Sequence, residues 1–243
     1  MNAFRLGSPQ ASMVWLEPHR VHAGGQTRSI SSPLTEDVLV MALQGLPAGP
    51  THWVVDDGWI PSILLRDIVE IPAGFDAREA FFKWRYAQSL ALEAPQSVQA
   101  LSLGENAWLL AGMPEETRDT WINASLTLGR PIRSLIPRWL WLYNRLAPTR
   151  EVPGMLLSLC PAGEDAYTGT LVAWGRGLTL LRQWTEPATA EAWIQERVLP
   201  SSSYLARDAR SPHELLVWGA PAWPECSIPS RVLQREIPAQ EAL

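Results

Sequence analysis

The sequence predicts an α/β protein with a mixed sheet, and three observations support this. Strand-like apolar runs alternate with amphipathic, helix-like segments along the 243 residues. Hydrophobic residues make up 47% of the chain, which is enough for a packed core. No apolar run approaches the roughly 18 residues that span a bilayer, and the opening residues lack the apolar stretch of a secretory signal. We therefore expect a soluble cytoplasmic protein without direct membrane insertion.

The first elements are predicted from turn and cap residues. Residues 13–25 predict a short strand or hairpin that turns at Glu17 and Pro18. Ser32 and Pro33 then suit the cap and first position of a helix that runs to about residue 46. Two apolar runs within residues 51–71 flank the tripeptide 56–58 (Asp-Asp-Gly), which predicts a β-hairpin.

The next segment predicts helices and strands in alternation. Asp76 and Glu79 form a capping-box pattern at the start of a helix over residues 76–90. Its apolar stripe is expected to face inward and comprises Ala77, Ala80, Phe81, Trp84, Ala87 and Ala91. Strands are predicted at 98–103, 106–113 and 131–137. Helices are predicted at 114–129, with Trp121, Ile122, Ser125 and Leu126 inward, and after Pro137.

A short linker at residues 148–153 predicts two lobes, 1–150 and 151–243. The second part predicts a buried strand at 154–160, a loop, and a hairpin that turns at Gly175–Gly177. A helix is expected at 189–199, a break at the three serines 201–203, and a last buried strand at 213–220. The tail after Pro224 is expected to be loosely packed.

Composition excludes several function classes. The net charge of −5 argues against nucleic-acid binding, which needs a basic surface. Of 20 basic residues only Lys83 is a lysine, and it lies in a predicted amphipathic helix, so neither a Walker-type loop nor Schiff-base chemistry is expected. The 13 tryptophans show no fixed period and are interpreted as core residues in preference to a sugar-stacking platform. Two cysteines are too few for a disulfide framework.

Each candidate for chemistry has a structural alternative that the pattern favours. Asp56 and Asp57 are interpreted as turn residues, because neighbours on a strand point to opposite faces. The same argument separates His19 from His22, so no metal site is expected. Cys160 is interpreted as a packing residue. The loop 162–170, which contains Asp165, resembles a phosphate loop, but the pattern favours a hairpin.

The order of elements over residues 52–147 resembles the type IV pilus assembly protein PilM and the cytoplasmic part of its type II secretion counterpart GspL, relatives of the actin-like ATPases. The resemblance rests on "ILLRDIVEIPAGFDAREAFFKW", with Arg66 and Pro72 at corresponding places, and on the run from "AWLLAGM" to "WLYNRL", with Gly129 and Pro131 in register. It implies an actin-like (ribonuclease H-like) fold with mixed sheets flanked by helices and a shortened second lobe.

The three nucleotide loops of that family are degraded here. Where the resemblance places an acidic, glycine-containing phosphate loop, this chain has Glu17 followed by Pro18; the second loop offers Asp165, and the adenosine region a single Gly219. These are the nearest candidates for cofactor binding, and we expect neither nucleotide hydrolysis nor a bound cofactor.

Three functions stay open from the sequence. The first is a non-catalytic scaffold of a type IV pilus or type II secretion platform, peripheral at the inner membrane, that binds the cytoplasmic tail of a bitopic, PilN-like protein by strand-edge or groove binding. Other assembly-platform proteins are expected as further partners. Arg66 and Lys83 are then candidate partner contacts. The second is an ATP-binding actin-like protein with an unorthodox site. The third is a tryptophan-rich module for sugars or aromatic ligands.

Overall fold

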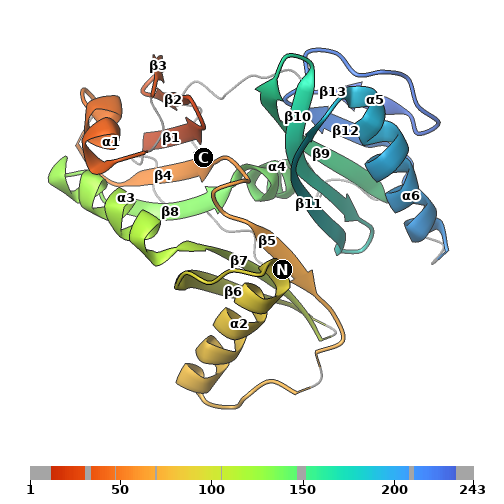
Figure 1. The fold of residues 1–243 in the computed structure, drawn as a ribbon, viewed down its shortest axis with the longest axis horizontal. Coiled ribbons are helices and arrows are strands. Elements are labelled where there is room, and N and C mark those ends of the chain that lie inside the picture. Colours follow the sequence, from red (N-terminus) through yellow and green to blue (C-terminus); the bar gives the residue numbers. More distant parts are fainter. Residues whose placement is uncertain are drawn as a thin grey trace.

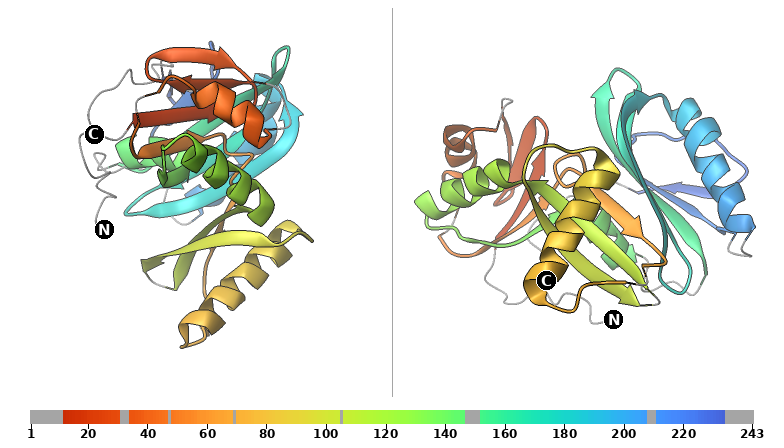
Figure 2. Two further views of the ribbon diagram at one scale, coloured as in Figure 1. Left: turned by 90° about the vertical axis from the view of Figure 1, so that its left-hand side faces the viewer. Right: turned by 60° about the horizontal axis from the view of Figure 1, so that its bottom comes forward.

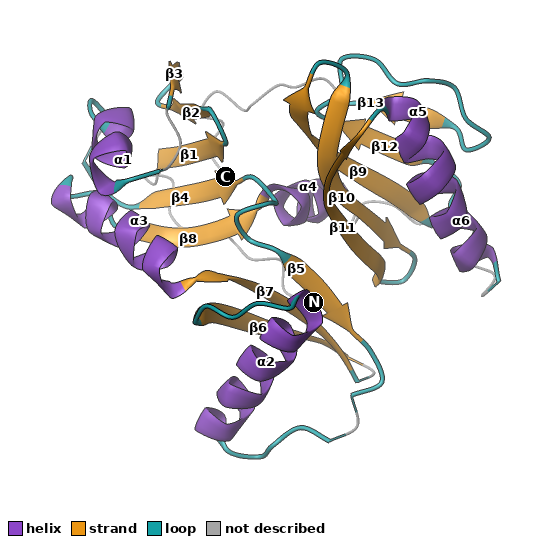
Figure 3. Cartoon of the chain, viewed as in Figure 1, coloured by secondary structure: helices purple, strands orange, loops and turns teal. Residues whose placement is uncertain are grey.

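A computed structural model describes residues 12–30, 34–46, 48–68, 70–104, 106–146, 152–207 and 211–233. The chain forms strands and helices in alternation, which confirms the predicted α/β class (Figures 1 and 3). The strands are β1 Ser12–Glu17, β2 Arg20–Ala23, β3 Gln26–Ser29, β4 Thr51–Val55, β5 Ser62–Leu65, β6 Gln96–Gly104, β7 Ala107–Pro114, β8 Ile132–Pro137, β9 Gly154–Gly163, β10 Ala166–Trp174, β11 Leu178–Ala188, β12 Leu215–Trp218 and β13 Ser230–Val232. The helices are α1 Glu36–Leu43, α2 Phe75–Leu90, α3 Glu115–Thr127, α4 Arg138–Leu146, α5 Ala190–Ala192 and α6 Leu199–Ala206, with a π-helical segment, Trp193–Val198, between the last two.

Two five-stranded sheets share one topology. Their strand orders are β3-β2-β1-β4-β8 and β11-β10-β9-β12-β13. In each, the first three strands along the chain are antiparallel neighbours, and the two later strands are added in parallel. We call the first sheet with α1 and α3 the first lobe, and the second sheet with the helical segment 190–206 the second lobe. The repeat is visible in the backbone, whereas the sequence shows no fixed-period repeat.

The lobes stack as alternating layers of helix and sheet, with α4 in the middle (Figure 1). Alternation along β1 sends Val14 and Leu16 toward α1 and α3, and Trp15 into the core around α4. The run "MLLSLC" on β9 does the same between α4 and the helical segment 190–206. Because β9 is covered on both faces, it is apolar at nearly every position. Most tryptophans fill these cores, as predicted; those that are almost completely buried are Trp15, Trp53, Trp121, Trp139 and Trp193.

A smaller antiparallel sheet, β5-β7-β6, carries α2 on one face (Figure 2). The predicted helix is confirmed, but its cap is wrong, and its inward face is only partly right, since Phe81 of the predicted stripe packs against the core and Trp84 does not. Gly74 is the N-cap, so Asp76 lies inside the first turn. Phe82 and Tyr86 are the buried residues, while Trp84 is 56% exposed. Tyr86 favours this face, because its hydroxyl lies 2.8 Å from the carbonyl oxygen of Pro61 and 2.9 Å from that of Gly112, which share its one proton.

The predicted hairpin at Asp56–Gly58 is wrong. β4 pairs with β1 and β8 in the first lobe, whereas β5 pairs with β7 in the small sheet. The segment therefore carries the chain from one sheet to another.

The cap of α1 also differs from the prediction. The side chain of Thr35 caps this helix, and the expected cap residues Ser32 and Pro33 lie outside the described residues.

The helix predicted at 114–129 is confirmed as α3. Trp121 and Ser125 face inward as expected, but Ile122 and Leu126 are exposed, and Ala124 is the third buried residue. In the second lobe the predicted break at the three serines is wrong, because residues 199–206 are helical and Ser201 is buried. The segment after Pro224 packs more closely than predicted over its first residues, since Ile228 is buried and β13 pairs with β12. Most of the predicted linker 148–153 lies outside the described residues.

Candidate functional site

The carboxyl end of β4 holds two adjacent buried aspartates. Asp56 is 6% exposed and Asp57 is 2% exposed. Asp56 accepts a hydrogen bond from the backbone N–H of Gly58 (3.0 Å), which is the turn role expected of it. Its second carboxylate oxygen lies 3.1 Å from Nη1 of Arg138, so the residue is also half of a buried ion pair. The interpretation of the two aspartates as turn residues alone is therefore wrong.

Arg138 is the first residue of α4 and is 1% exposed. Besides Asp56, it donates from Nε to the Ser158 hydroxyl (3.0 Å) and from Nη2 to the Leu159 carbonyl (3.1 Å), both on β9. Burial lowers the pKa of this guanidinium, but the charges of Asp56 and Asp57 raise it by more, so Arg138 stays charged. One side chain thus joins the end of β4 to the central strand of the second lobe.

The side chain of Asp57 lies against the N-terminus of α4, which begins at Arg138. Its Oδ1 accepts the backbone N–H of Trp139 (2.8 Å), one of the donors that a helix leaves unsatisfied at its N-terminus. Burial raises the pKa of Asp57 to about 6; the charge of Arg138 acts against this shift and the charge of Asp56 adds to it. The carboxyl is consequently poised to change protonation in mildly acidic solution.

A small cleft opens between these groups and the second lobe. It measures about 190 Å³, and its lining includes Asp56, Asp57, Arg138, Cys160, Gln183 and Trp184. Ligand pockets are commonly about 300–1,000 Å³, so the cleft is small for a nucleotide. Cys160 is a poor nucleophile here, because burial raises the pKa of its thiol to about 12 and so keeps it protonated. It is 7% exposed, as expected of a packing residue.

The three cofactor-binding candidates lie at the end of β1, in the β9–β10 turn and after β12. The charge of Glu17 acts on Arg138, and Gly219 packs on the Leu159 carbonyl that accepts from Arg138. Glu17 ends β1, is 6% exposed, and lies 3.6 Å from His22. Asp165 lies in the two-residue turn between β9 and β10, so the loop is a hairpin, which was the favoured alternative. Gly219 follows β12 with φ of +94°, and a Cβ there would lie 2.0 Å from the Leu159 carbonyl oxygen. Close packing against β9 by itself accounts for this glycine.

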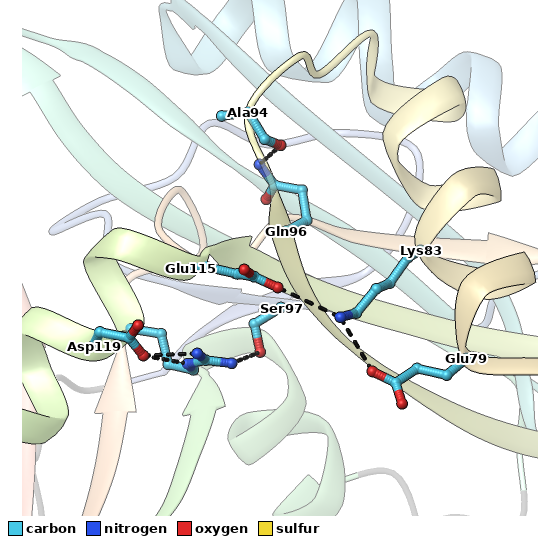
Figure 4. Close-up of polar contacts among 8 residues, drawn as sticks. Glu79, Lys83, Ala94, Gln96, Ser97, Glu115 and Asp119 are labelled. Atoms are coloured by element: carbon cyan, nitrogen blue, oxygen red, sulfur yellow. Dashed lines mark hydrogen bonds and ion pairs between the residues drawn. The ribbon is translucent and has the colours of Figure 1, made fainter. Parts of the chain in front are cut away.

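The partner-contact candidates make contacts within the chain. Arg66 donates to the carbonyls of Leu178 (3.3 Å) and Thr179 (2.6 Å) on β11, which ties the small sheet to the second lobe. Lys83 lies 3.1 Å from Glu79 on its own helix and 3.4 Å from Glu115 at the start of α3 (Figure 4). The hydrogen bond to Glu79 is the main reason that the pKa of Lys83 is raised.

A polar seam, formed by Lys83, Glu115, Arg118 and Ser97, joins α2, α3 and β6 (Figure 4). Arg118 donates to the Ser97 hydroxyl (3.1 Å) and pairs with its neighbour Asp119 (2.7 Å). Most of these side chains are more than one-third exposed, so each pair contributes little stability. The seam orients the small sheet against the first lobe.

Beside the seam, β6 is an edge strand of nine residues with no charged residue and no proline. Four consecutive residues, 99–102, are exposed. Charges, prolines and short lengths normally protect sheet edges from pairing. The other edge strands of the described sheets carry such features or are at most four residues long. β6 is therefore the strand best suited to accept an extended chain.

The fold defined by these observations is a two-lobed α/β architecture with an additional small sheet, and two solved structures are similar to it. No family model and no curated protein matches the sequence. The cytoplasmic domain of EpsL, an inner membrane component of the type II secretion system of Vibrio cholerae, is similar with a TM-score of 0.51 at 12% identity, over 91% of this chain and 88% of that one.

A second similar structure is the PilM–PilN type IV pilus biogenesis complex. The match has a TM-score of 0.52 at 12% identity and covers 87% of this chain and 81% of the matched chain. The resemblance to the PilM and GspL proteins is thus confirmed at the level of the fold.

Neither a metal cluster nor a membrane-spanning helix is present among the described residues. They contain no group of three or more His, Cys, Asp or Glu side chains arranged to hold a metal ion. No helix within the described ranges is long and apolar enough to cross a membrane.

Sequence reasoning missed Arg138 entirely. The residue follows Pro137 in an aromatic, amphipathic segment, where an arginine is typical of a solvent-facing helix position. One signal in the sequence was available. Asp56 and Asp57 end an apolar strand and would need a cation if buried, and all but one of the basic residues in this chain are arginines.

Proposed function

We propose that this protein is a non-catalytic scaffold of a type IV pilus or type II secretion assembly platform, located in the cytoplasm at the inner membrane. The observation that carries the proposal is the shared fold with the EpsL cytoplasmic domain and with the PilM–PilN complex over most of this chain. We further propose that each five-stranded sheet is a ribonuclease H-like unit and that the second lobe is shortened; the common strand order supports the first of these two points.

The proposed partner is the cytoplasmic tail of a bitopic, PilN-like inner-membrane protein. The tail pairs as an extended strand with β6, because this edge is long, uncharged and exposed over residues 99–102. Backbone hydrogen bonds supply affinity, and the alternating side chains of β6 supply specificity. Lys83, in the seam beside β6, acts as a flanking contact through the exposed part of its side chain. Arg66 follows β5 at the opposite edge of the small sheet and would contact a partner only on that side.

The local chemistry of the cleft supports a non-catalytic role. Asp56 is paired with Arg138, and Oδ1 of Asp57 accepts the N–H of Trp139, so a magnesium ion would have to compete with a buried arginine for these carboxylates. The space left is small for a nucleotide. Titration calorimetry with ATP and Mg²⁺ tests this part; binding at micromolar concentration would support the alternative of an ATP-binding protein.

Tail binding is tested with synthetic peptides that represent the cytoplasmic tails of bitopic proteins from the pilus and secretion machines of the same cell. Calorimetry should show binding of one such peptide to the wild type. Leu101→Lys places a charge on the exposed edge of β6 and should weaken binding at least tenfold, because a charge there disfavours strand addition. Met41→Lys, on α1, is the matched control and should leave binding unchanged. Failure of every tail to bind would refute the proposal.

A further inference from the structure

Two side chains fasten the lobes together across the cleft. Arg138, which directly follows β8 of the first lobe, contacts Asp56 at the end of β4 and Ser158 and Leu159 on β9 of the second lobe. Gln183, on β11 of the second lobe, contacts the segment that leaves β4. Its amide N–H donates to the Asp57 carbonyl (2.6 Å) and its amide oxygen accepts the N–H of Ser62 (3.2 Å).

These contacts differ from the apolar packing around α4. Packing of apolar side chains is roughly non-directional and tolerates small rotations. Arg138 instead donates from Nε and Nη2 to two acceptors on β9, and Gln183 uses both ends of its amide on backbone groups 57 and 62. Each interaction weakens steeply with angle, so together they select one orientation of the lobes.

Burial makes opening costly. Arg138 and Asp56 are 1% and 6% exposed. If the lobes moved apart, Arg138 would lose its hydrogen bonds to Ser158 and Leu159, and the buried acceptors on β9 would lose their donor. Arg66, which donates to two carbonyls on β11, adds a third tie just after the end of β5. Arg138, Gln183 and Arg66 therefore each connect the segment 56–66 with strand β9 or strand β11.

We propose that Arg138 and Gln183 form a permanent interlobe clasp, so that the protein has one fixed lobe arrangement and does not open and close around a ligand. The clasp sets the geometry of the surface offered to partners without needing a nucleotide or other bridging molecule. This inference does not rest on the proposed function, because it concerns the isolated protein.

The test measures the distance between the lobes by pulsed electron paramagnetic resonance. Spin labels are attached at Asn123→Cys on α3 and Ser203→Cys on α6, which are exposed positions in the two lobes. A Cys226→Ser background avoids labelling of that partly exposed thiol, and Cys160 is buried. The wild-type lobe pair should give one narrow distance distribution, unchanged by ATP with Mg²⁺.

Gln183→Ala should broaden this distribution, and Arg138→Met should broaden it further. Gln99→Ala on β6 and Arg133→Met on β8 are exposed matched controls and should leave it narrow. If Arg138→Met fails to fold, as near-UV circular dichroism would reveal, Gln183→Ala decides the matter because it leaves no buried charge unpaired. Two distances in the wild type, a shift on adding ATP with Mg²⁺, or no broadening in Gln183→Ala would overturn the proposal.

Discussion

Asp57 caps a helix that begins 81 residues further along the chain: its Oδ1 lies 2.8 Å from the backbone nitrogen of Trp139 in the first turn of α4. A carboxylate at a helix N-terminus satisfies an unpaired N–H and interacts favourably with the helix dipole. The contact places the end of β4 directly against the helix that separates the two sheets. It also buries a titratable group at the centre of the molecule.

Replacing Asp57 tests the pH dependence of this group. Burial raises its pKa from 3.8 to about 6. Between about pH 4 and pH 6 the folded protein holds a proton that the unfolded chain has released, so this carboxyl makes the free energy of unfolding fall as pH rises through that window. Asp57→Asn keeps the acceptor oxygen and removes the titration. Relative to the wild type, the variant should gain stability from pH 4 to pH 7 in urea unfolding.

The exposed residue Asp76 provides the control for this experiment. Asp76→Asn makes the same chemical change at an exposed carboxyl and controls for the loss of one acidic group. A wild-type profile that runs parallel to that of Asp57→Asn from pH 4 to pH 7 would show that the folded-state pKa of Asp57 is not raised.

Replacing Arg138 tests the buried ion pair. Arg138→Met leaves Asp56 and Asp57 buried without their cation, and removal of one partner from a buried pair costs about 3–5 kcal/mol. The double variant Arg138→Met/Asp56→Asn should recover part of this loss, because fewer charges stay unpaired. Chemical denaturation measures both, with Arg133→Met as the exposed control. If Arg138→Met lowers the free energy of unfolding by less than about 1 kcal/mol, the pair contributes no more than an exposed ion pair, which would contradict the prediction.

Replacing Gly219 separates packing from ligand binding. Its φ is +94°, and the Cβ of an alanine would lie 2.0 Å from the Leu159 carbonyl oxygen. Gly219→Ala should therefore lower the free energy of unfolding by at least about 2 kcal/mol. Gly177→Ala, in the turn before β11, has open space around its Cβ and should cost less than about 1 kcal/mol. Thermal unfolding of the ligand-free protein distinguishes the two. Equal stability of the variants would leave Gly219 without a packing role.

Replacing Tyr86 tests what fixes the inward face of α2. Tyr86→Phe removes the hydroxyl that donates to the carbonyls of Pro61 and Gly112, and should cost about 1–2 kcal/mol. Tyr204→Phe, at a tyrosine that is 48% exposed, is the control and should be nearly neutral. Urea unfolding gives both values. A neutral Tyr86→Phe would mean that Phe82 alone determines the face.

The sequence by itself determined the α/β class, the positions of α2, α3 and α4, and the burial of most tryptophans. These features follow from periodicity and composition within ten to twenty residues, which are local properties of the chain. The resemblance to PilM and GspL was likewise visible in the order of elements, and the fold agrees with it.

Only the tertiary structure decided what the polar residues do. The pattern "DDG" between apolar runs is typical of a hairpin, yet β4 and β5 join different sheets because each finds its partner strands elsewhere in the chain. The face of α2 depends on carbonyls of Pro61 and Gly112, and the role of Asp56 depends on Arg138, 82 residues away in sequence. Long-range hydrogen bonds and ion pairs leave no periodic trace in a sequence, because they depend on which distant segments the fold brings together.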